Sequence, residues 1–556
     1  MSRKPVDKLL GVIDFETDPF KYGRIPKPFA VGILHEQPSG LPCYVYFWGG
    51  ECVADMVDYF TALSYPLTIY AHNGGRFDFY LMLRYLQNPI RIIHGRVICA
   101  GFGKHQLRDS WAIIPMPLKA ANKKDSISYE KLEADVREKH RVEILAYLRT
   151  DCVSLFELVV AFNARFGPRL TIASTAMREL VALHPQFHQR ESHDDMFRPY
   201  YFGGRVECFE FGVINAPLKL YDVNSMYPHA MREFRHPLGA GYLTPGRMRL
   251  NREGWFIDFP GSMYFATVTG WNKGALPMRD ADNNGGLSFT ATYGVFQTTS
   301  HELRAAMQLG LFKVDTILDA RVPRNTQTFT TFVDTFVAEK IKAKRTGDPI
   351  GERFAKLILN SAYGRFGIDP FEFYDYAIVH YHDDDQRDYV GEGFEPYESN
   401  RQYVIWRRRT NERALPGEGS TTRGFADVAI AASITSAARS VLMRAIVGSI
   451  RPIYCDTDSI ICEGLRGVSF SDTALGAWKL EGTGNRIAIA GKKLYALYND
   501  QVVVKVASKG VKLTGDEITR VALGEQINWK NDAPNFALGG GASFTHRTAK
   551  STIRRQ

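Results

Sequence analysis

Two aspartates lie one residue apart inside an apolar segment, Ile453-Tyr454-Cys455-Asp456-Thr457-Asp458-Ser459-Ile460-Ile461. Burying charge away from water is costly, so carboxylates in such a place need a compensating partner. The flanking residues are typical of β-strands, which predicts a hairpin with Asp456 and Asp458 near its tip. Residues i and i+2 of an extended chain project to one face, so the pair is a candidate site for a hard cation. An ordinary acidic turn is the alternative interpretation.

A second acidic set lies in the N-terminal third of the chain. An apolar segment that is predicted to be a strand runs into Asp14 and Glu16, which share one face by the two-residue period of a strand. Further along, segment 143–151 is predicted to be helical and places Tyr147 and Asp151 one turn apart on one face.

A fourth acid lies between these elements. Segment 67–72 is a predicted strand, and it is followed by Asn73-Gly74-Gly75-Arg76-Phe77-Asp78, in which Asp78 opens an apolar helix that continues through 79–83. Four acids on three separated elements match the needs of two-metal phosphodiester cleavage. There, carboxylates hold two Mg²⁺ ions and a further polar group orients the attacking water.

In this order, the three segments resemble the motifs of the DEDDy class of 3′–5′ exonucleases, which have an RNase H-like fold. The resemblance implies four carboxylate metal ligands and a tyrosine that orients the water: Asp14, Glu16, Asp78, Asp151 and Tyr147. It also assigns Asn73 and Phe77 to contact with DNA.

Between these segments lie Asp109-Ser110-Trp111 and Lys123-Lys124-Asp125-Ser126-Ile127. They are similar to stretches of protein-primed family B DNA polymerases that hold a frayed primer end, and the resemblance implies that Ser110 and Lys124 contact DNA. Trp111 stands where that family usually has leucine, although an aromatic ring could stack on an unpaired base. A loop serine and a solvated lysine are the alternatives.

A further acid ends a predicted strand in the segment Leu218-Lys219-Leu220-Tyr221-Asp222-Val223-Asn224-Ser225-Met226-Tyr227-Pro228. This segment resembles polymerase motif A, with Met226 in place of leucine, which conserves volume. The resemblance implies that Asp222 and the Val223 backbone complete the metal site of the hairpin. It also implies that Tyr227 lies under the incoming sugar and excludes a 2′-hydroxyl, so that deoxynucleotides are the substrates.

Residues 323–366 are predicted to form two helices that are interrupted at Thr346-Gly347-Asp348-Pro349. On the second helix, Lys356, Asn360 and Tyr363 form one polar and aromatic stripe. A lysine aimed at a triphosphate and a tyrosine platform for the base are what a nucleotide-binding helix needs. The stretch KLILNSAYG matches polymerase motif B, KxxxNSxYG, without a mismatch.

Several other segments resemble DNA-contacting motifs of the same polymerases: a YxGG loop at 201–205, a Tx2AR motif in a helix predicted over 431–443, and KxY at 493–495. The residues expected to contact DNA there are Tyr201, Gly203, Gly204, Thr435, Arg439, Lys493 and Tyr495. Lys344 is a candidate phosphate contact or a solvated lysine. The basic segment 546–555 either contacts DNA or is a solvated tail.

Together the motifs span about residues 14–495 and resemble a protein-primed family B DNA polymerase of the phage or linear-plasmid type. The implied fold is α/β and α+β multidomain, with an RNase H-like exonuclease domain before a right-hand polymerase that carries two insertions. The expected division is an exonuclease domain at 1–185, a linker at 186–200 and a polymerase domain at 201–556. Within the last we expect palm at about 201–235 and 421–490, insertion one at about 236–322, fingers at about 323–366, insertion two at about 367–420 and thumb at about 491–556.

The implied activity is DNA-directed DNA synthesis on a linear genome, with strand displacement and 3′–5′ proofreading. Asp222 and Asp458 would bridge two Mg²⁺ ions, with Mn²⁺ as a substitute, while Asp456 supports the hairpin. The expected partners are primer–template DNA, dNTPs, a terminal protein that primes synthesis and contacts insertion one, and a single-stranded DNA-binding protein. Insertion two would encircle DNA, and the chain would act as a monomer.

Three alternatives remain open. Synthesis could begin from an ordinary nucleic-acid primer or from none. The chain could be a DEDDy exonuclease whose second half is only a DNA-binding scaffold, although the intact acids and Lys356 argue against this. A noncatalytic binding or assembly module is the third.

Composition is consistent with a nucleic-acid partner inside a cell. The formal net charge is +9 with a pI near 9.0, which favours a polyanionic partner. Seven scattered cysteines without a CxxC pair indicate neither a disulfide framework nor a zinc site and suit a reducing cytosol. We find no signal-peptide core and no apolar run near the roughly 18 residues of a membrane span, so we expect a cytoplasmic protein, in the host if phage-encoded.

Overall fold

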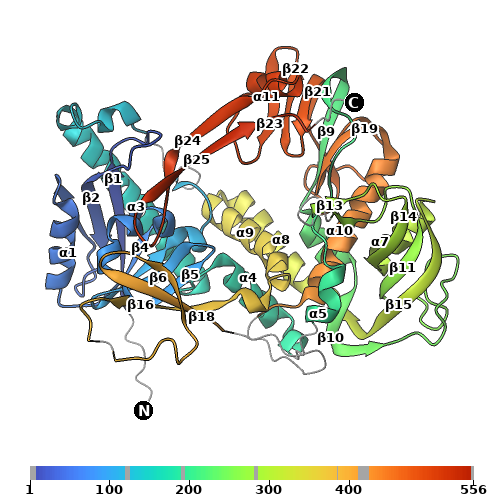
Figure 1. Ribbon diagram of the computed structural model, residues 1–556, viewed down its shortest axis with the longest axis horizontal. Helices are drawn as coiled ribbons and strands as arrows, with labels where there is room; N and C mark the ends of the chain where they lie inside the picture. Colours follow the sequence, from blue (N-terminus) through green and yellow to red (C-terminus); the bar gives the residue numbers. More distant parts are fainter. Residues whose placement is uncertain are drawn as a thin grey trace.

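The computed structural model describes residues 8–118, 126–188, 194–280, 286–384, 386–410 and 425–552. Lys124 and the last basic residues of the chain therefore lie outside the described residues. Figure 1 shows two lobes, with a group of helices between them and a long β-hairpin passing above these helices.

The N-terminal lobe is built on a sheet of ten strands in the order β17-β18-β16-β5-β6-β7-β4-β1-β2-β3. Their bounds are β1 (Leu9–Thr17), β2 (Pro28–His35), β3 (Cys43–Trp48), β4 (Leu67–Ala71), β5 (Gln87–Ile93), β6 (Arg96–Phe102), β7 (His105–Asp109), β16 (Tyr374–His380), β17 (Glu395–Ser399) and β18 (Tyr403–Arg409). The last three come from the predicted insertion two. Asn88 joins them to β5, since its side chain donates to Ile378 O at 2.8 Å and accepts from Ile378 N at 2.9 Å.

Helices α1 (Cys52–Ala62) and α3 (Arg141–Phe166) cover opposite faces of this sheet. Alternate residues of β1 explain this, because Val12 packs in the core that contains α3 and Ile13 packs in the core that contains α1. The predicted strand at Asp14 and the helix around Tyr147 are therefore confirmed, and the helix is longer than expected. The apolar helix predicted after Asp78 is too long: α2 (Asp78–Leu81) has four residues, because the chain leaves the helical conformation at Met82 before it enters β5.

A second sheet of seven strands has the order β23-β22-β21-β9-β20-β19-β8. The strands are β8 (Val206–Cys208), β9 (Gly212–Val223), β19 (Ser449–Asp456), β20 (Ser459–Leu465), β21 (Trp478–Gly491), β22 (Leu494–Asn499) and β23 (Val502–Ser508). Helix α11 (Gly515–Ala522) packs on β21 and β22, and α10 (Val428–Gly448) lies beside β20. α10 is apolar enough to pass as a membrane span, contrary to our expectation, with a mean hydropathy of 1.4; however, 78% of its apolar window is buried in the protein, as in a core helix.

The predicted insertion one folds as a separate four-stranded sheet in the order β10-β15-β11-β14, with a two-stranded sheet of β12 and β13. Its elements are β10 (His236–Leu243), β11 (Phe265–Asn272), β12 (Met278–Asp280), β13 (Gly286–Ser288), β14 (Tyr293–Thr299), α7 (Ser300–Gln308) and β15 (Phe312–Gln327). The two-helix prediction was wrong for 323–327, which are strand because they pair with β10.

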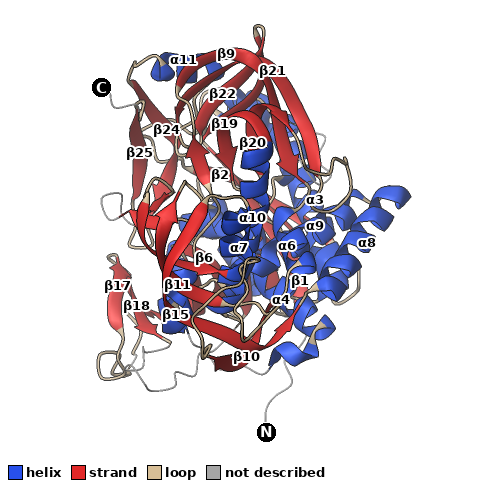
Figure 2. Ribbon diagram, turned by 90° about the vertical axis from the view of Figure 1, so that its right-hand side faces the viewer, coloured by secondary structure: helices blue, strands red, loops and turns tan. Residues whose placement is uncertain are grey.

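Helices α4 (Ile172–Leu183), α6 (Met226–Glu233), α8 (Thr330–Thr346) and α9 (Pro349–Phe366) pack against one another. Figure 2 shows α8 and α9 together on one side of the molecule. The predicted break between them is confirmed, since Gly347 has φ 68° and Asp348 caps α9 by accepting from Gly351 N at 2.8 Å.

The segment expected to be an irregular linker is partly helical, since it contains α5 (Asp194–Phe197) and a 3₁₀ turn at 198–200. These elements bury Phe197 and Tyr200 in a cluster that also contains Phe265 and Val428. All seven cysteines are free in the structure, and five of them are buried.

The C-terminal hairpin of β24 (Ile527–Phe536) and β25 (Ala542–Ala549) reaches back to the N-terminal lobe (Figure 1). The Phe536 ring stacks on Tyr80 at 5.5 Å, and the Tyr403 hydroxyl donates to Leu538 O at 2.9 Å. The basic segment that begins at His546 is therefore β-strand through Ala549, with the His546 and Arg547 side chains exposed; its residues after Thr552 lie outside the described part of the chain.

Candidate functional site

The acidic hairpin forms as predicted, and it lies beside Asp222. β19 and β20 pair so that Asp456 faces Ser459, and Ser459 in turn faces Asp222 on β9. The Val223 N–H donates to the Asp458 carbonyl oxygen at 2.8 Å. Three segments of sequence thus bring Asp222 and Asp458 to one end of the sheet.

Both carboxyl groups are in an environment that disfavours their charge. Burial, and then the Asp458 carboxylate, raise the pKa of Asp222 to about 7. Burial also raises the pKa of Asp458. Glu481 of β21, which the sequence did not single out, adds its charge to both groups. A bound cation is what would relieve this repulsion.

Asp456 differs from Asp458 because Lys493 neutralises it. The Lys493 ammonium lies 2.5 and 2.6 Å from the two Asp456 carboxylate oxygens, and Tyr454 OH donates to the same carboxylate at 3.3 Å. The expectation that the two aspartates share one face by strand periodicity was wrong, since Thr457 has φ 60° and the strand ends before Asp458.

The KxY segment lies directly on this hairpin. Lys493 sits in the turn between β21 and β22, and its N–H donates to Tyr454 OH at 3.0 Å. The Tyr495 side chain is buried, with its ring 4.7 Å from that of Tyr454. In this structure, Lys493 and Tyr495 therefore support the hairpin.

The YxGG loop fits against the tip of the same hairpin. Thr457 N–H donates to Arg205 O at 2.7 Å, and a Cβ on Gly204 would lie 2.6 Å from Thr457 Oγ1. Tyr201 packs against Gly367, which follows α9, while Gly203 is exposed.

Arg439 holds this loop from the inside. Its guanidinium donates to Phe202 O at 2.7 Å and Gly203 O at 2.9 Å, and it forms a buried ion pair with Glu302 at 2.6 Å. Both side chains, Thr435 and Arg439, are buried at 3% exposure in α10, and their contact with DNA stays a prediction.

The two tyrosines predicted for the nucleotide site meet face to face. Tyr227, in the first turn of α6, and Tyr363 of α9 stack with ring centroids 3.9 Å apart and planes at 15°. Lys356 and Asn360 are exposed on α9, which confirms the predicted stripe, and Lys344 is exposed on α8.

Three acids of the N-terminal lobe form a compact cluster. Carboxylate oxygens of Asp14, Glu16 and Asp151 lie within 4.8 Å of one another. α3 can approach β2 because Gly32 has no side chain; a Cβ there would lie 2.9 Å from Cys152 Sγ. Burial, and then these three carboxylates, raise the pKa of Tyr147, so its hydroxyl stays protonated beside them.

Asp78 lies outside that three-membered set but borders it. It is fully buried, it interacts with the backbone of Phe15 on β1, and burial raises its pKa to about 7. Asp109, which the sequence did not single out, adds to this shift. Asp109 could have been found from the sequence, because it is an acid in the short segment between two apolar runs.

The predicted DNA contacts near this cluster differ in exposure. Asn73 is half-buried with φ 63°, and the Phe77 ring lies 5.3 Å from Phe20 and 5.8 Å from Phe536. Ser110 is fully buried and donates to Ala71 O at 3.2 Å, and its contact with DNA stays a prediction.

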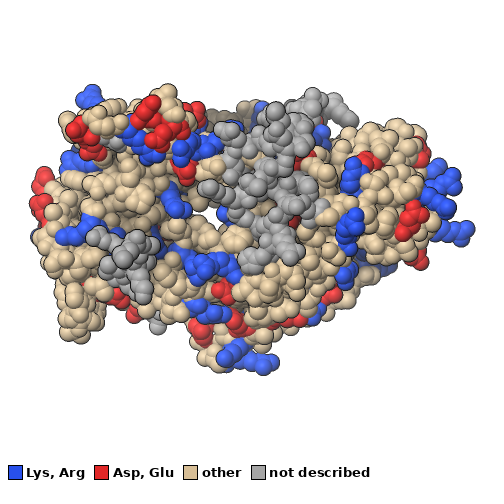
Figure 3. Space-filling model, turned by 90° about the horizontal axis from the view of Figure 1, so that it is seen from below, with Lys and Arg blue, Asp and Glu red and all other residues tan. Residues whose placement is uncertain are grey.

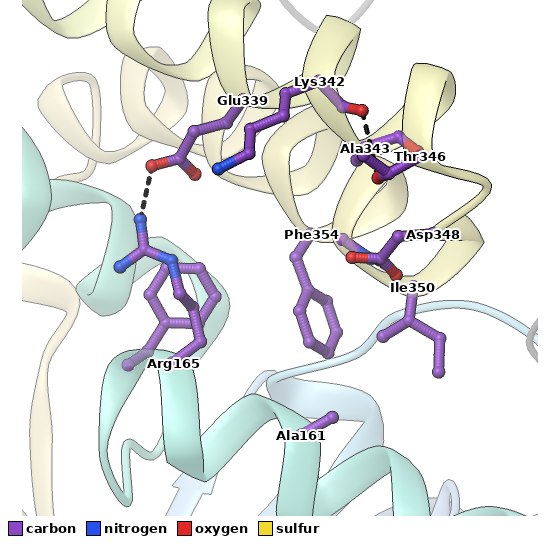
Figure 4. Close-up of a pocket in the computed structure, with 11 residues that line it drawn as sticks. Ala161, Arg165, Glu339, Lys342, Ala343, Thr346, Asp348, Ile350 and Phe354 are labelled. Carbon is purple, nitrogen blue, oxygen red and sulfur yellow. Dashed lines mark hydrogen bonds and ion pairs between the residues drawn. The ribbon is translucent and has the colours of Figure 1, made fainter.

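A cavity of about 380 Å³ lies elsewhere, between α3 and the turn that joins α8 to α9 (Figure 4). Arg165 and Glu339 form an ion pair of 2.6 Å at its edge. It is lined by Ala161, Arg165, Phe166, Glu339, Lys342, Ala343, Thr346, Asp348, Ile350, Gly351 and Phe354. These lining residues do not include any of the predicted acids or tyrosines.

The chain is similar in sequence to known DNA polymerases. Residues 104–446 match the family described as DNA polymerase type B, organellar and viral. The chain is 41% identical to the DNA-directed DNA polymerase of Enterobacteria phage PRD1, covering 99% of both proteins. It is 24% identical to a probable DNA polymerase of Agaricus bitorquis, covering 85% of this chain and 69% of that protein.

Solved structures give the same fold. Phi29 DNA polymerase complexed with primer-template DNA superimposes with a TM-score of 0.68 at 18% identity, covering 98% of this chain and 100% of that one. Its complex with primer-template DNA and incoming nucleotide substrates superimposes with a TM-score of 0.66. The chain has the multidomain α/β fold of a family B polymerase, it belongs to the organellar and viral type B DNA polymerases, and it is a DNA-directed DNA polymerase.

Proposed function

We propose that Asp222 and Asp458 are the catalytic carboxylates of nucleotidyl transfer. The adjacent pair at the end of β9 and β20, with the raised pKa values of both groups, carries this proposal. Two Mg²⁺ ions, or Mn²⁺, held by these carboxylates and the Val223 carbonyl would activate the primer 3′-OH and neutralise the triphosphate. Asp456 holds Lys493 at the primer side of the site.

The stacked tyrosines form the proposed nucleotide platform. Tyr227 blocks the space of a 2′-hydroxyl, while Lys356 and Lys344 attract the triphosphate and Asn360 lines the same helix face. Replacing Tyr227 with valine should admit ribonucleotides, as measured by incorporation of rNTPs against dNTPs. Unchanged sugar discrimination would contradict the steric role.

We propose a second activity, 3′–5′ proofreading, for the acid cluster of the N-terminal lobe. Asp14, Glu16 and Asp151 offer converging carboxylate oxygens, and Asp78 borders them. Hydrolysis of a phosphodiester requires such ligands for divalent cations. Tyr147 keeps its proton and is placed to orient the attacking water.

The proposed partners are primer–template DNA and dNTPs. The YxGG loop and Lys493 lie along the proposed path of the duplex, with Tyr495 supporting Lys493 from the core. Asn73, Phe77 and Lys124 lie along the proposed path of a single strand to the acid cluster of the N-terminal lobe. The net charge of +9 supports binding to phosphates. Figure 3 shows an opening near the middle of one face, with lysine and arginine side chains at its edge. On the strength of the family likeness we also propose priming by a terminal protein, strand displacement, a single-stranded DNA-binding partner and action in the host cytoplasm as a monomer. The expected domain boundaries are part of the same proposal.

Primer extension by the purified chain with Mg²⁺ and dNTPs tests the main proposal. We expect extension that Asp458→Asn abolishes. Incubation with labelled dNTP and the cognate terminal protein tests priming, where a covalent nucleotide–protein adduct is expected. Extension of ordinary primers without any adduct would favour the nucleic-acid-primed alternative.

A further inference from the structure

The segment between β4 and α2, residues 73–77, lies unusually close to β6. A Cβ on Gly75 would lie 2.1 Å from Val97 O, and one on Gly74 would lie 2.5 Å from Ala71 Cβ. Both positions therefore require glycine. Asn73, which precedes them, has φ 63°, a left-handed conformation that asparagine adopts more readily than most residues other than glycine.

Arg96, the first residue of β6, holds the side chain of Asn73. Its Nη1 donates to Asn73 Oδ1 at 2.9 Å and to Asp109 Oδ2 at 2.6 Å. The Asp109 side chain is fully buried, and it also accepts from Trp111 N at 3.0 Å. A buried carboxylate that is bonded on several sides gives the guanidinium a fixed anchor.

This contact decides how the Asn73 side chain is oriented. A guanidinium can only donate hydrogen bonds, so it must face the amide oxygen and not the amide nitrogen. The Asn73 Nδ2 group makes no hydrogen bond within the described part of the chain, and the side chain is half-buried. Its two N–H donors thus remain for an external acceptor.

We infer that Arg96 is a positioning residue that presents the Asn73 amide N–H groups to a phosphate or sugar oxygen of a single-stranded DNA 3′ end. This inference rests on the proposed exonuclease function of the same lobe. The strand would lie beside Asp78, five residues further along the segment, while Arg96 itself stays bonded to Asp109.

The kinetics of degradation of a single-stranded oligonucleotide test this inference. Asn73→Asp keeps an acceptor for Arg96 but replaces the amide donor with a carboxylate that repels phosphate, so KM should rise by about tenfold or more. Arg96→Gln should also raise KM by about tenfold, whereas Arg96→Lys, which retains charge and donors, should restore part of the loss. The value of kcat and primer extension should change little in all three variants.

Arg91→Gln on the neighbouring strand is the matched control, since Arg91 is exposed, and its KM should equal that of the wild type. An unchanged KM in Asn73→Asp or Arg96→Gln would overturn the inference while leaving the exonuclease proposal intact. A parallel loss of primer extension and of thermal stability would overturn it in favour of a purely structural role. Absence of degradation by the wild-type chain would instead refute the exonuclease proposal itself.

Discussion

At the scale of single residues, Asp456 and Asp458 are close in sequence but have different neighbours in the structure. Asp456 is paired with Lys493, whereas Asp458 and Asp222 lie near each other and form no ion pair within the described residues of the chain, so lysines act on them only from a distance. Charge in such a place is tolerated only if a ligand brings the opposite charge. The pattern D-T-D alone does not distinguish these two roles.

We therefore expect the two aspartates to respond differently to neutralisation. Asp458→Asn should lower the rate of nucleotide incorporation by more than about a thousandfold, because a metal ligand is lost. Asp456→Asn should cost less, since it weakens the placement of Lys493 without removing a bridging ligand. Single-turnover incorporation measures both; equal losses would contradict the assignment.

The raised pKa values of Asp222 and Asp78, both about 7, predict a pH-dependent effect of metal. Without metal, the folded state holds these protons more tightly than the unfolded state, so the free energy of unfolding should fall as pH rises from about 4 to about 7. Mg²⁺ binds the ionised carboxylates and should offset this fall. The increase in Tm on adding Mg²⁺ should therefore be larger at about pH 8 than at about pH 5.

The double variant Asp222→Asn, Asp78→Asn is the control, with its Tm measured by scanning calorimetry with and without Mg²⁺. Its Tm should respond less to Mg²⁺ at either pH. An equal Mg²⁺ response in wild type and variant would show that the metal binds elsewhere.

At the scale of elements, the proposed polymerase site depends on the fit between a loop and a hairpin. The YxGG loop touches Thr457 at the hairpin tip, and Arg439 of α10 fixes its carbonyl groups from below. The ion pair of Arg439 with Glu302 extends this support to α7 in insertion one. Three elements from distant parts of the chain thus set the position of Asp458.

Adjacent glycines of the loop give a matched test of this fit. Gly204→Ala should lower both Tm and the rate of primer extension, because its Cβ would press on Thr457. Gly203→Ala should be nearly neutral for stability, since a Cβ there meets nothing within 4 Å. Similar losses in both variants would point to a need for backbone freedom instead.

At the scale of the whole molecule, the two acidic sites lie on two different sheets, although one buried apolar cluster contains residues from both. The cluster at Asp14 sits on the ten-stranded sheet, and Asp222 sits on the seven-stranded sheet. Shared helices link the lobes, because Phe162 of α3 packs edge-on against Phe354 of α9 at 5.5 Å. The sites are therefore chemically independent but mechanically connected.

The double variant Asp14→Ala, Asp78→Ala should abolish 3′–5′ degradation and retain primer extension within about twofold. Gel analysis of a labelled primer with and without dNTPs measures both activities in one sample. Loss of extension together with degradation would contradict two separate sites.

The local sequence predicted the strands and helices that carry the acids. The spacing of apolar residues that marks a strand or a helix can be recognised within one short segment. It placed Lys356, Asn360 and Tyr363 correctly on one helix face for the same reason. It did not predict the burial of Ser110, Thr435 and Arg439, since burial depends on elements that pack from far along the chain.

The supporting residues were missed for a related reason. Arg96, Asp109 and Glu481 lie in unremarkable strands, and their roles arise only from neighbours on adjacent strands. The addition of β16 to the edge of the first sheet is likewise a pairing between distant segments, which no local pattern encodes.

That pairing has a consequence for how the chain is made. The side-chain amide of Asn88 forms its hydrogen bonds with the backbone of Ile378, which lies 290 residues later. Domains tend to fold as they leave the ribosome, and closing so long a loop carries an entropic cost. The N-terminal lobe must therefore wait, with the edge of β5 open, until most of the polymerase has been synthesised. A gene fragment that ends near residue 185 would leave this edge permanently uncovered, and would be prone to associate with other strands.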